Sequence, residues 1–327
     1  MSLVAEFARE LHERESVDNF RPLSPFRTFA QAEKLFDVHA VIFDVYGTLV
    51  NYWMPAYTGE EGKLAFLEEA FDRTARQFGM TDFLAVMNPA DPPAKTLRDF
   101  YHGLIALDHE KSRKRGIEYP EVKIERIWEL IILMLKRHGY SIDELDLGDS
   151  AEVSRCVAYY YNFHALGRGF FPGVVDALTA LREKNIKLGI VSNAQFYTPI
   201  DLTLFLRDQS NNRLDDYLEL FDVDLVLMSY QVGRAKPGKM LFEKLYDALY
   251  ELHILPEQTV FVGNDLISDI APARQAGMRT AFFSGDRASS FTHGREGSVV
   301  PDIAFSGWEE LPDLLSFYEE KPSESRK

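Results

Sequence analysis

The sequence predicts an α/β protein in which a doubly wound parallel sheet is interrupted by an inserted all-helical domain. Two observations lead to this prediction. From Gly167 onward, short apolar runs alternate with amphipathic helical patterns, and this alternation is typical of a parallel sheet with helices on both faces. Between a first apolar run at Val38–Val45 and Gly169, by contrast, the pattern is helical and contains no convincing strand.

An amphipathic helix is predicted near the N-terminus. Apolar residues recur at helical spacing within residues 3–14, and prolines mark residues 19–25 as a linker. We therefore assign residues 1–37 to an N-terminal helical arm. We expect this arm to pack on its own chain rather than to mediate dimerisation.

The predicted α/β core comprises residues 38–50 and 171–327, and residues 51–170 form the predicted insertion. After the first strand, further strands are expected at Lys187–Val191, Val223–Met228, Thr259–Val262, Arg279–Phe283 and near Ile303. Helices of the core are expected at residues 174–182, 198–220, 237–252, 267–276 and 311–318. Helical patterns in the insertion lie at residues 64–75, 97–107, 124–135 and 153–161.

Composition and charge limit the classes of function. The chain has 327 residues, of which 46% are hydrophobic and 27% charged, as in an ordinary soluble globular protein. Its formal net charge of -15 argues against nonspecific nucleic-acid binding, which needs a basic surface. A small anionic substrate is still compatible with this charge, because a lysine or a bound cation can reverse the sign inside one cleft.

Other absences in the sequence bear on the cellular compartment. Cys156 is the only cysteine, so an intrachain disulfide and a Cys-based zinc site are excluded. No apolar run approaches the roughly 20 residues that cross a bilayer, and the charged N-terminal region is unlike a signal peptide. We therefore expect a cytoplasmic protein with a small-molecule substrate and with neither a nucleic-acid nor a membrane partner. The sequence leaves a homodimer open.

Asp44 stands at the end of the first predicted strand and is followed at once by Gly47 and Thr48. Buried parallel strands read as continuous apolar runs, and ligands bind outside the carboxyl ends of such strands in open α/β sheets. The pattern therefore predicts that the strand presents the Asp44 carboxylate at a ligand-binding edge. We interpret Asp44 as a nucleophile.

Three more polar clusters follow the ends of later predicted strands: Ser192 with Asn193, Lys236 before Pro237, and Gly263-Asn264-Asp265 with Asp269. Each cluster alone has an ordinary structural explanation as a turn, a helix start or a helix cap. Because parallel strands end at the same edge of a sheet, all four together predict one site around Asp44.

This combination resembles the haloacid dehalogenase-like hydrolase superfamily. The residues that carry the resemblance are Asp44-Val45-Tyr46-Gly47-Thr48-Leu49, Ser192, Lys236-Pro237 and Gly263-Asn264-Asp265 with Asp269. The resemblance implies a Rossmann-like core, and the helical insertion occupies the position of the family's first type of cap domain. That cap would close over the site and select the substrate.

The resemblance also implies a mechanism. Asp44 would attack the substrate and form a covalent aspartyl intermediate, which water then hydrolyses, while Lys236 would neutralise developing charge. Gly47, Thr48, Ser192 and Asn193 would bind the transferring group. A magnesium ion would be bound by oxygen atoms of Asp44, Asp265, Asp269 and the Tyr46 backbone carbonyl.

Tyr46 departs from the pattern of the family's phosphatases, which carry a second Asp at this position as the general acid. The Asp-x-Tyr-Gly-Thr form resembles the 2-haloacid dehalogenases instead, and a halide leaving group needs no proton. Two observations argue against a dehalogenase: Phe242 stands where an aromatic hydroxyl is expected, and both Asp265 and Asp269 are present.

Other residues have uncertain roles. In an alternative spacing, Asn264 rather than Asp265 would pair with Asp269 at the metal. Arg98 is the nearest candidate for binding a substrate carboxylate, although a charged residue on a helix is usually solvated. The role of the Tyr46 side chain is open. Water or a cap residue would supply the proton to the leaving group, and the cap candidates are Tyr159, Tyr160, Tyr161 and His164, for which an aromatic helix core is the commoner arrangement.

Three hypotheses follow. The leading one is a Mg²⁺-dependent phosphatase that acts on a small phosphorylated metabolite through Asp44. The second is a metal-independent 2-haloacid dehalogenase that uses the same nucleophile. The third is a non-catalytic protein that keeps the fold and binds a ligand or a partner.

Overall fold

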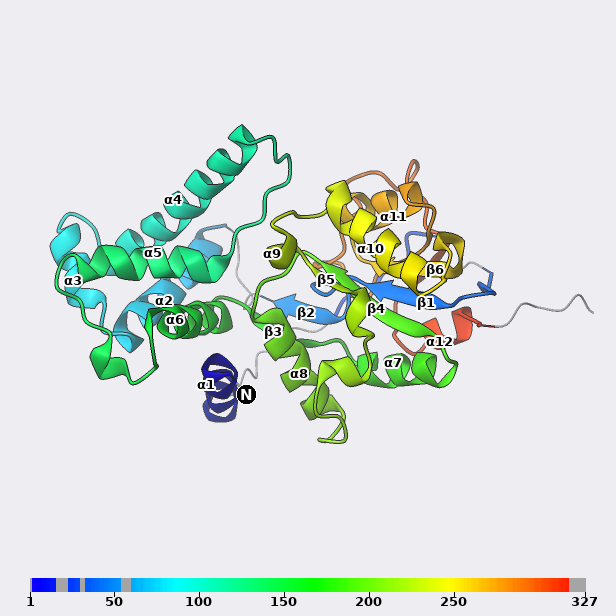
Figure 1. Ribbon diagram of the computed structural model, residues 1–327, viewed down its shortest axis with the longest axis horizontal. Coiled ribbons are helices and arrows are strands. Elements are labelled where there is room, and N and C mark those ends of the chain that lie inside the picture. The colour runs from blue at the N-terminus through cyan, green and yellow to red at the C-terminus, as the bar shows by residue number, and fades with distance from the viewer. Residues whose placement is uncertain (1, 16–22, 30–32, 54–59, 318–327) are drawn as a thin grey trace, which may run out of the picture. The chain divides into compact units, whose positions relative to one another are not determined.

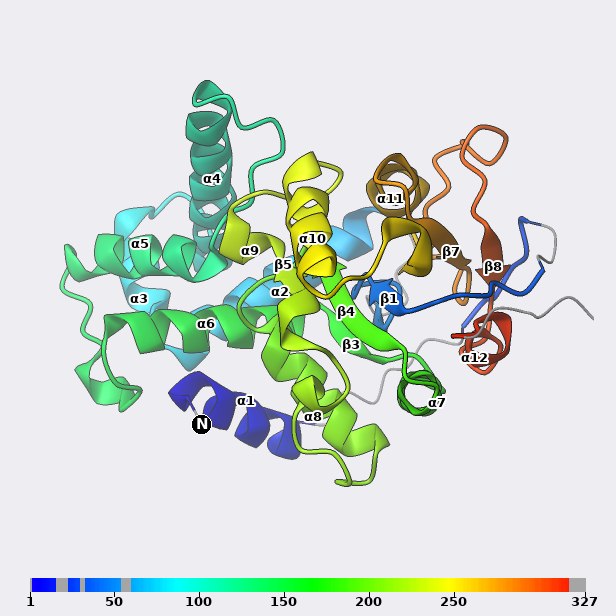
Figure 2. The same ribbon diagram turned by 45° about the vertical axis from the view of Figure 1, so that its right-hand side comes forward.

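The computed structural model of this chain describes residues 2–15, 23–29, 33–53 and 60–317. The chain forms two compact units, shown in Figure 1 and Figure 2. The helical unit consists of residues 1–21, 52–168 and 195–204, and the α/β unit of residues 22–51, 169–194 and 205–327. No helix in the described part of the chain is long and apolar enough to cross a bilayer.

Six strands form the sheet of the α/β unit, and every pairing between them is parallel, as predicted. They follow the order β5-β4-β1-β6-β7-β8. Their bounds are β1 Ala40–Phe43, β4 Lys187–Ser192, β5 Val226–Met228, β6 Thr259–Gly263, β7 Arg279–Phe283 and β8 Ile303–Phe305. In this doubly wound order the chain direction across the sheet reverses between β1 and β6. Ligands bind at this switch point in open α/β sheets.

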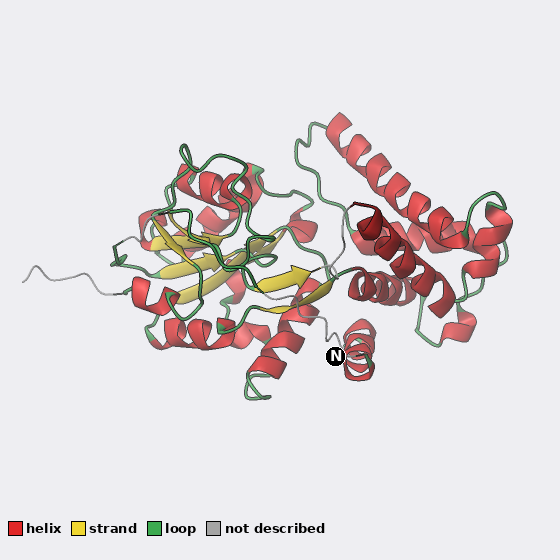
Figure 3. Cartoon of the chain, turned by 180° about the vertical axis from the view of Figure 1, so that it is seen from behind, coloured by secondary structure: helices red, strands yellow, loops and turns green. Residues whose placement is uncertain are grey.

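Helices cover both faces of this sheet, with α10 and α11 on one face and α7 and α12 on the other (Figure 1 and Figure 3). The bounds are α7 Val174–Glu183, α9 Ser229–Val232, α10 Lys239–Glu251, α11 Ala271–Gln275 and α12 Leu311–Leu314. All four residues of β1 are buried. Ile42 and Phe261 from the sheet share one core with Leu245 of α10, so the centre of the sheet is rigidly packed beneath the switch point.

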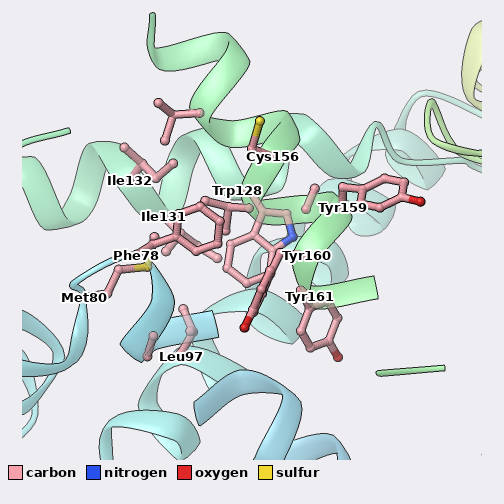
Figure 4. Close-up of a cluster of buried hydrophobic side chains, with 14 of the residues drawn as sticks. Phe78, Met80, Leu97, Trp128, Ile131, Ile132, Cys156, Tyr159, Tyr160 and Tyr161 are labelled. Atoms are coloured by element: carbon pink, nitrogen blue, oxygen red, sulfur yellow. The ribbon is translucent and has the colours of Figure 1, made fainter. Parts of the chain in front are cut away.

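Six helices make up most of the helical unit: α1 Leu3–Arg14, α2 Glu60–Gln77, α3 Thr81–Met87, α4 Pro93–Lys114, α5 Ile124–Lys136 and α6 Ser150–Ala165. Their common core includes Trp128 of α5 and Tyr161 of α6, as Figure 4 shows. The first helix contributes Val4, Ala8 and Leu11 to this same core. The N-terminal helix is therefore an integral part of the helical unit.

A fully buried ion pair joins two distant segments of the helical unit. The Arg168 guanidinium lies 2.5 Å (Nε) and 3.1 Å (Nη2) from the two carboxylate oxygens of Asp201, and Arg168 and Asp201 are only 5% and 2% exposed. The Tyr159 hydroxyl donates to Asp201 Oδ1 at 2.7 Å, and His12 of α1 lies 2.9 Å from that hydroxyl. The network satisfies a buried charge that would otherwise be costly.

The structure differs from the expected organisation in several places. A second, two-stranded sheet pairs β2 (Val50–Trp53) with β3 (Gly167–Phe170), where no strand was predicted. Residues 195–204, which include the first part of α8 (Thr198–Gln209), belong to the helical unit. The expected arm at residues 1–37 is divided between the units. Its last part packs in the α/β unit, where Leu35 pairs with Leu315 and the C-terminal helix ends earlier than expected.

Candidate active site

Asp44 follows β1 directly, and its backbone N–H donates to Val262 O of the neighbouring β6 at 2.9 Å. The residue is only 6% exposed. Its Oδ1 atom accepts hydrogen bonds from Ser192 Oγ at 2.9 Å and from Lys236 Nζ at 2.6 Å. Among the residues that the structure describes, its Oδ2 atom has one long contact, with Thr48 Oγ1 at 3.4 Å. The carboxylate is therefore held through one oxygen, while the other is the more available for a ligand.

Gly47 forms the turn after Asp44 with a φ of +86°, a conformation that favours glycine. A Cβ atom here would also collide with the Asn264 side chain and lie 2.9 Å from Ser289 O. Both the turn and its close approach to β6 therefore require glycine. The next residue, Thr48, is fully buried and donates to Asn264 Oδ1 at 3.0 Å.

Lys236 lies between two carboxylates, with its Nζ 2.6 Å from both Asp44 Oδ1 and Asp269 Oδ1. Asn193 holds the lysine backbone, because its Oδ1 accepts from Lys236 N at 2.7 Å and its Nδ2 donates to Lys236 O at 3.1 Å. Burial alone would lower the pKa of Lys236, but Asp269 and Asp44 outweigh it and raise the pKa above its ordinary value. The lysine is thus a fixed positive charge.

Asp269 uses both carboxylate oxygens within the protein. Oδ1 binds Lys236, and Oδ2 accepts from the backbone N–H groups of Asn264 at 3.2 Å and Asp265 at 3.1 Å. Burial raises the pKa of Asp269, Lys236 opposes this and Asp44 adds to it, so that the pKa rises to about 7. The adjacent Gly263 allows this approach, because a Cβ there would collide with the Asp269 carboxylate.

Asp265 and Asn264 have different surroundings. Asp265 Oδ1 caps the π-helical turn η5 (Leu266–Ile270) by accepting from Ile267 N at 2.7 Å and Ser268 N at 2.9 Å. Its carboxylate also lies 3.0 Å from His293 Nε2. Asn264 instead contacts Thr48, which is the neighbour of Asp44. Thus Asn264 lies closer to the nucleophile's hydrogen-bond network, and Asp265 lies at its edge.

A cavity of about 140 Å³ opens among these residues at the carboxyl ends of the strands. Its lining consists of Asp44, Tyr46, Asn193, Lys236, Asn264, Asp265, Ser268, Asp269 and Phe291. The structure thus brings residues from all four predicted strand ends together. Ser192 is not among the lining residues, but its hydroxyl donates a hydrogen bond to Asp44. Their chemical roles remain predictions.

The candidates in the predicted insertion lie inside the helical unit. Arg98 is ion-paired with Glu68 and Asp99. The three consecutive tyrosines of α6 are buried in the helical core, and burial raises the pKa of Tyr161 and of Tyr160. The Tyr159 hydroxyl donates a hydrogen bond to Asp201. These contacts give the tyrosines the aromatic-core role that was the commoner expectation.

Sequence reasoning missed the loop between β7 and β8. Phe291 from this loop lines the cavity, and Ser289 O accepts a hydrogen bond from Asn264 Nδ2. No strand ends at these residues and no periodic pattern marks them. The one available signal is an aromatic residue in a polar loop, Phe291-Thr292-His293, which is too common to single out.

The donor set is compatible with Mg²⁺ but does not form a closed metal cage. Among the described residues, no group of three or more His, Cys, Asp or Glu side chains is placed to hold a metal ion. Magnesium usually keeps several waters and needs only one or two carboxylates with a phosphate. The cavity supplies oxygen atoms from Asp44, Asp265 and Asn264. Its lining includes three carboxylates and one ammonium group, so an anionic substrate would need an added cation.

The raised pKa of Asp269 predicts that the contribution of this group to the stability of the metal-free protein falls as pH rises. Because the folded pKa of about 7 exceeds the ordinary 3.8, the contribution of this group is fully present below about pH 4 and is lost as pH rises through about 7. Asp269→Asn keeps the shape of the protonated carboxyl group and should flatten this dependence. Urea unfolding with a chelator from about pH 5 to about pH 8 measures it. Equal pH slopes for both proteins would contradict the prediction.

The fold and this arrangement define a Rossmann-like α/β core with polar residues gathered at its switch point. The chain belongs to the haloacid dehalogenase-like hydrolases, the family whose pattern matches residues 38–277. This match confirms the superfamily predicted from the sequence.

Two curated relatives are phosphatases. The ribulose-1,5-bisphosphate 5-phosphatase of Halopiger xanaduensis is 28% identical over 177 residues, 53% of this chain. That match spans 64% of the relative, which is less than two thirds of its length. The glyceraldehyde 3-phosphate phosphatase of Pyrococcus furiosus is 27% identical over 224 residues, 64% of this chain and 85% of the relative.

A solved structure also shares the fold. The 2-haloacid dehalogenase from Pseudomonas syringae pv. Tomato superimposes with a TM-score of 0.50 at 22% identity, covering 85% of this chain and 97% of the dehalogenase. At this identity the likeness concerns the fold alone.

Proposed function

We propose that this protein is a Mg²⁺-dependent phosphatase that acts on a small phosphorylated metabolite through an aspartyl-phosphate on Asp44. One observation carries the proposal. Ser192 and Lys236 bind Asp44 Oδ1, whereas the contact of Oδ2 within the described part of the chain is a long one of 3.4 Å with Thr48. A carboxylate fixed through one oxygen at a switch-point cavity is suited to nucleophilic attack with the other. The phosphatase activities of the two curated relatives support this reaction class.

The proposed reaction has two steps. Asp44 Oδ2 forms a bond to phosphorus while the bond to the ester oxygen breaks, and the departing alkoxide takes a proton from water to become the alcohol. Water then attacks the aspartyl-phosphate, releases inorganic phosphate and regenerates the carboxylate. Lys236 offsets negative charge on the transferring group, and the Asn193 contacts to its backbone hold it in place. Ser192, Thr48 and the turn at Gly47 fix Asp44 and the cavity wall around it.

We further propose that Asp44, the Tyr46 backbone carbonyl and Asp265 bind the magnesium ion, with Asn264 as the alternative to Asp265. When bound, the ion would neutralise charge on the phosphoryl oxygens. Asp269 has a different proposed task from the one expected, because both of its oxygens already bind Lys236 and backbone N–H groups. It would position Lys236. The insertion-derived helical unit is one proposed source of substrate selectivity.

A metal-independent 2-haloacid dehalogenase is the second candidate. It is favoured by Tyr46, which lines the cavity and stands where the family's phosphatases carry a second Asp. In that reaction Asp44 would displace a halide from carbon, and no proton would be needed by the leaving group.

One assay separates these candidates. Phenyl phosphate hydrolysis and chloride release from 2-chloropropionate are measured with added Mg²⁺ and with a chelator. We expect phosphate release that depends on Mg²⁺. Phosphate release unaffected by chelation would reject the metal requirement, and metal-independent chloride release would identify the dehalogenase. Absence of activity toward a broad panel of phosphomonoesters and haloacids would favour the hypothesis of a non-catalytic binding protein.

A further inference from the structure

Phe291 is a large apolar residue placed beside Asp44. The residue lines the same cavity as the proposed nucleophile, and it is 39% exposed. Among the described residues that line this cavity, only Phe291 and Tyr46 carry an aromatic ring, and the remainder are polar or charged. An exposed aromatic ring at a polar cavity is a ready contact surface for the carbon part of a ligand.

The backbone of Phe291 is fixed to the end of β6. Phe291 N donates to Asn264 O at 2.7 Å, and Leu266 N donates to Phe291 O at 2.9 Å. Residue 291 thus pairs with Asp265 in the manner of a short added strand. The loop is therefore held by the strand end that supplies the proposed metal and lysine-binding residues.

The neighbours of Phe291 add two more attachments. The His293 ring stacks against Phe291 with centroids 6.1 Å apart and an interplanar angle of 26°. His293 Nε2 lies 3.0 Å from the Asp265 carboxylate, and Ser289 O accepts from Asn264 Nδ2. With three attachments across five residues, this segment is preorganised rather than free to swing away.

We propose that Phe291 is a specificity-determining residue that packs against the carbon skeleton next to the phosphoester bond. This inference rests on the proposed phosphatase function. It assigns the substrate class as phosphomonoesters with an apolar face near the ester oxygen. The substrate should be small, because a cavity of about 140 Å³ leaves little room beyond the phosphate. The polar residues of the cavity bind the phosphate itself. The Phe291 side chain has no hydrogen-bonding group and takes no part in that binding.

The test compares ligands that share a phosphorus group but differ in carbon content. Binding of phenylphosphonate and methylphosphonate is measured by calorimetry in the presence of Mg²⁺, together with kcat/KM for phenyl phosphate and methyl phosphate. Phe291→Ala should weaken phenylphosphonate binding about tenfold and methylphosphonate binding less than about twofold. Phe291→Leu retains apolar bulk and should lose less affinity for phenylphosphonate than Phe291→Ala does.

Val300→Ala is the matched control, because Val300 is a 50% exposed apolar residue on the same loop that does not line the cavity. It should change neither ligand's affinity. Equal weakening of both phosphonates by Phe291→Ala, or no weakening, would overturn the inference. Binding that discriminates as expected, in a protein that hydrolyses no phosphomonoester, would reject the proposed function while leaving the recognition role of Phe291 in place.

Discussion

Replacing Asp44 by Asn is expected to lower kcat for phosphomonoester hydrolysis by about 10⁴-fold or more. The amide has nearly the shape of the carboxylate and can keep the hydrogen bond from Ser192 through its oxygen. It lacks the negative charge that makes the carboxylate a nucleophile, so no aspartyl-phosphate can form. The fold should survive, because β1 keeps its apolar residues and its pairing with β4 and β6.

The measurement is turnover of phenyl phosphate, combined with mass spectrometry of acid-quenched protein to locate the covalent phosphate. Asp82→Asn is a suitable control, because Asp82 is an exposed residue in the first turn of α3. It should retain full activity. Substantial turnover by Asp44→Asn, or phosphate found on another residue, would refute the assignment of the nucleophile.

Replacing Arg168 by Met is expected to lower the free energy of unfolding of the helical unit by about 3–5 kcal/mol. Asp201 would remain 2% exposed without its cation, and an unpaired buried charge is far more costly than a lost surface pair. The methionine side chain fills much of the space left by the arginine stem. The loss should therefore come mainly from electrostatics rather than from a cavity.

Urea unfolding followed by tryptophan fluorescence reports this change, because Trp128 is buried in the core of the same unit. The double variant Arg168→Met with Asp201→Leu should recover part of the loss, since it removes both charges. Arg126→Met breaks an exposed pair with Glu129 and should cost no more than about 1 kcal/mol. A similar loss of unfolding free energy in the Arg126 and Arg168 variants would mean that burial does not determine how much an ion pair stabilises the protein.

The sheet was predictable because its strands are short apolar runs between helical patterns. All six runs pair in parallel, and the polar residues after them meet at one edge. The strand β3 was not predictable, because Gly167-Arg168-Gly169-Phe170 has neither an apolar run nor an alternating pattern. It pairs with β2 in a separate sheet, and such pairing depends on tertiary context rather than on local propensity.

The candidate site was predictable to the level of strand ends and no further. Spacing along the chain predicts the same metal-binding role for Asp265 and Asp269, but the hydrogen bonds of the two carboxylates differ. Asp269 turns inward to Lys236, and Asp265 turns to the start of η5 and to His293. This difference comes from the geometry of the turn after β6, which residue identity does not specify. Phe291 reaches the cavity from a loop remote in sequence, so no local pattern marks it.

The three-segment construction of the helical unit has a consequence for protein engineering. A fragment or chimera built from residues 51–170 alone would carry Arg168 without Asp201, and would lack the apolar side chains of α1 that complete the core. Such an excised piece should misfold or aggregate. Grafting this unit between relatives would therefore require all three segments to be transplanted together.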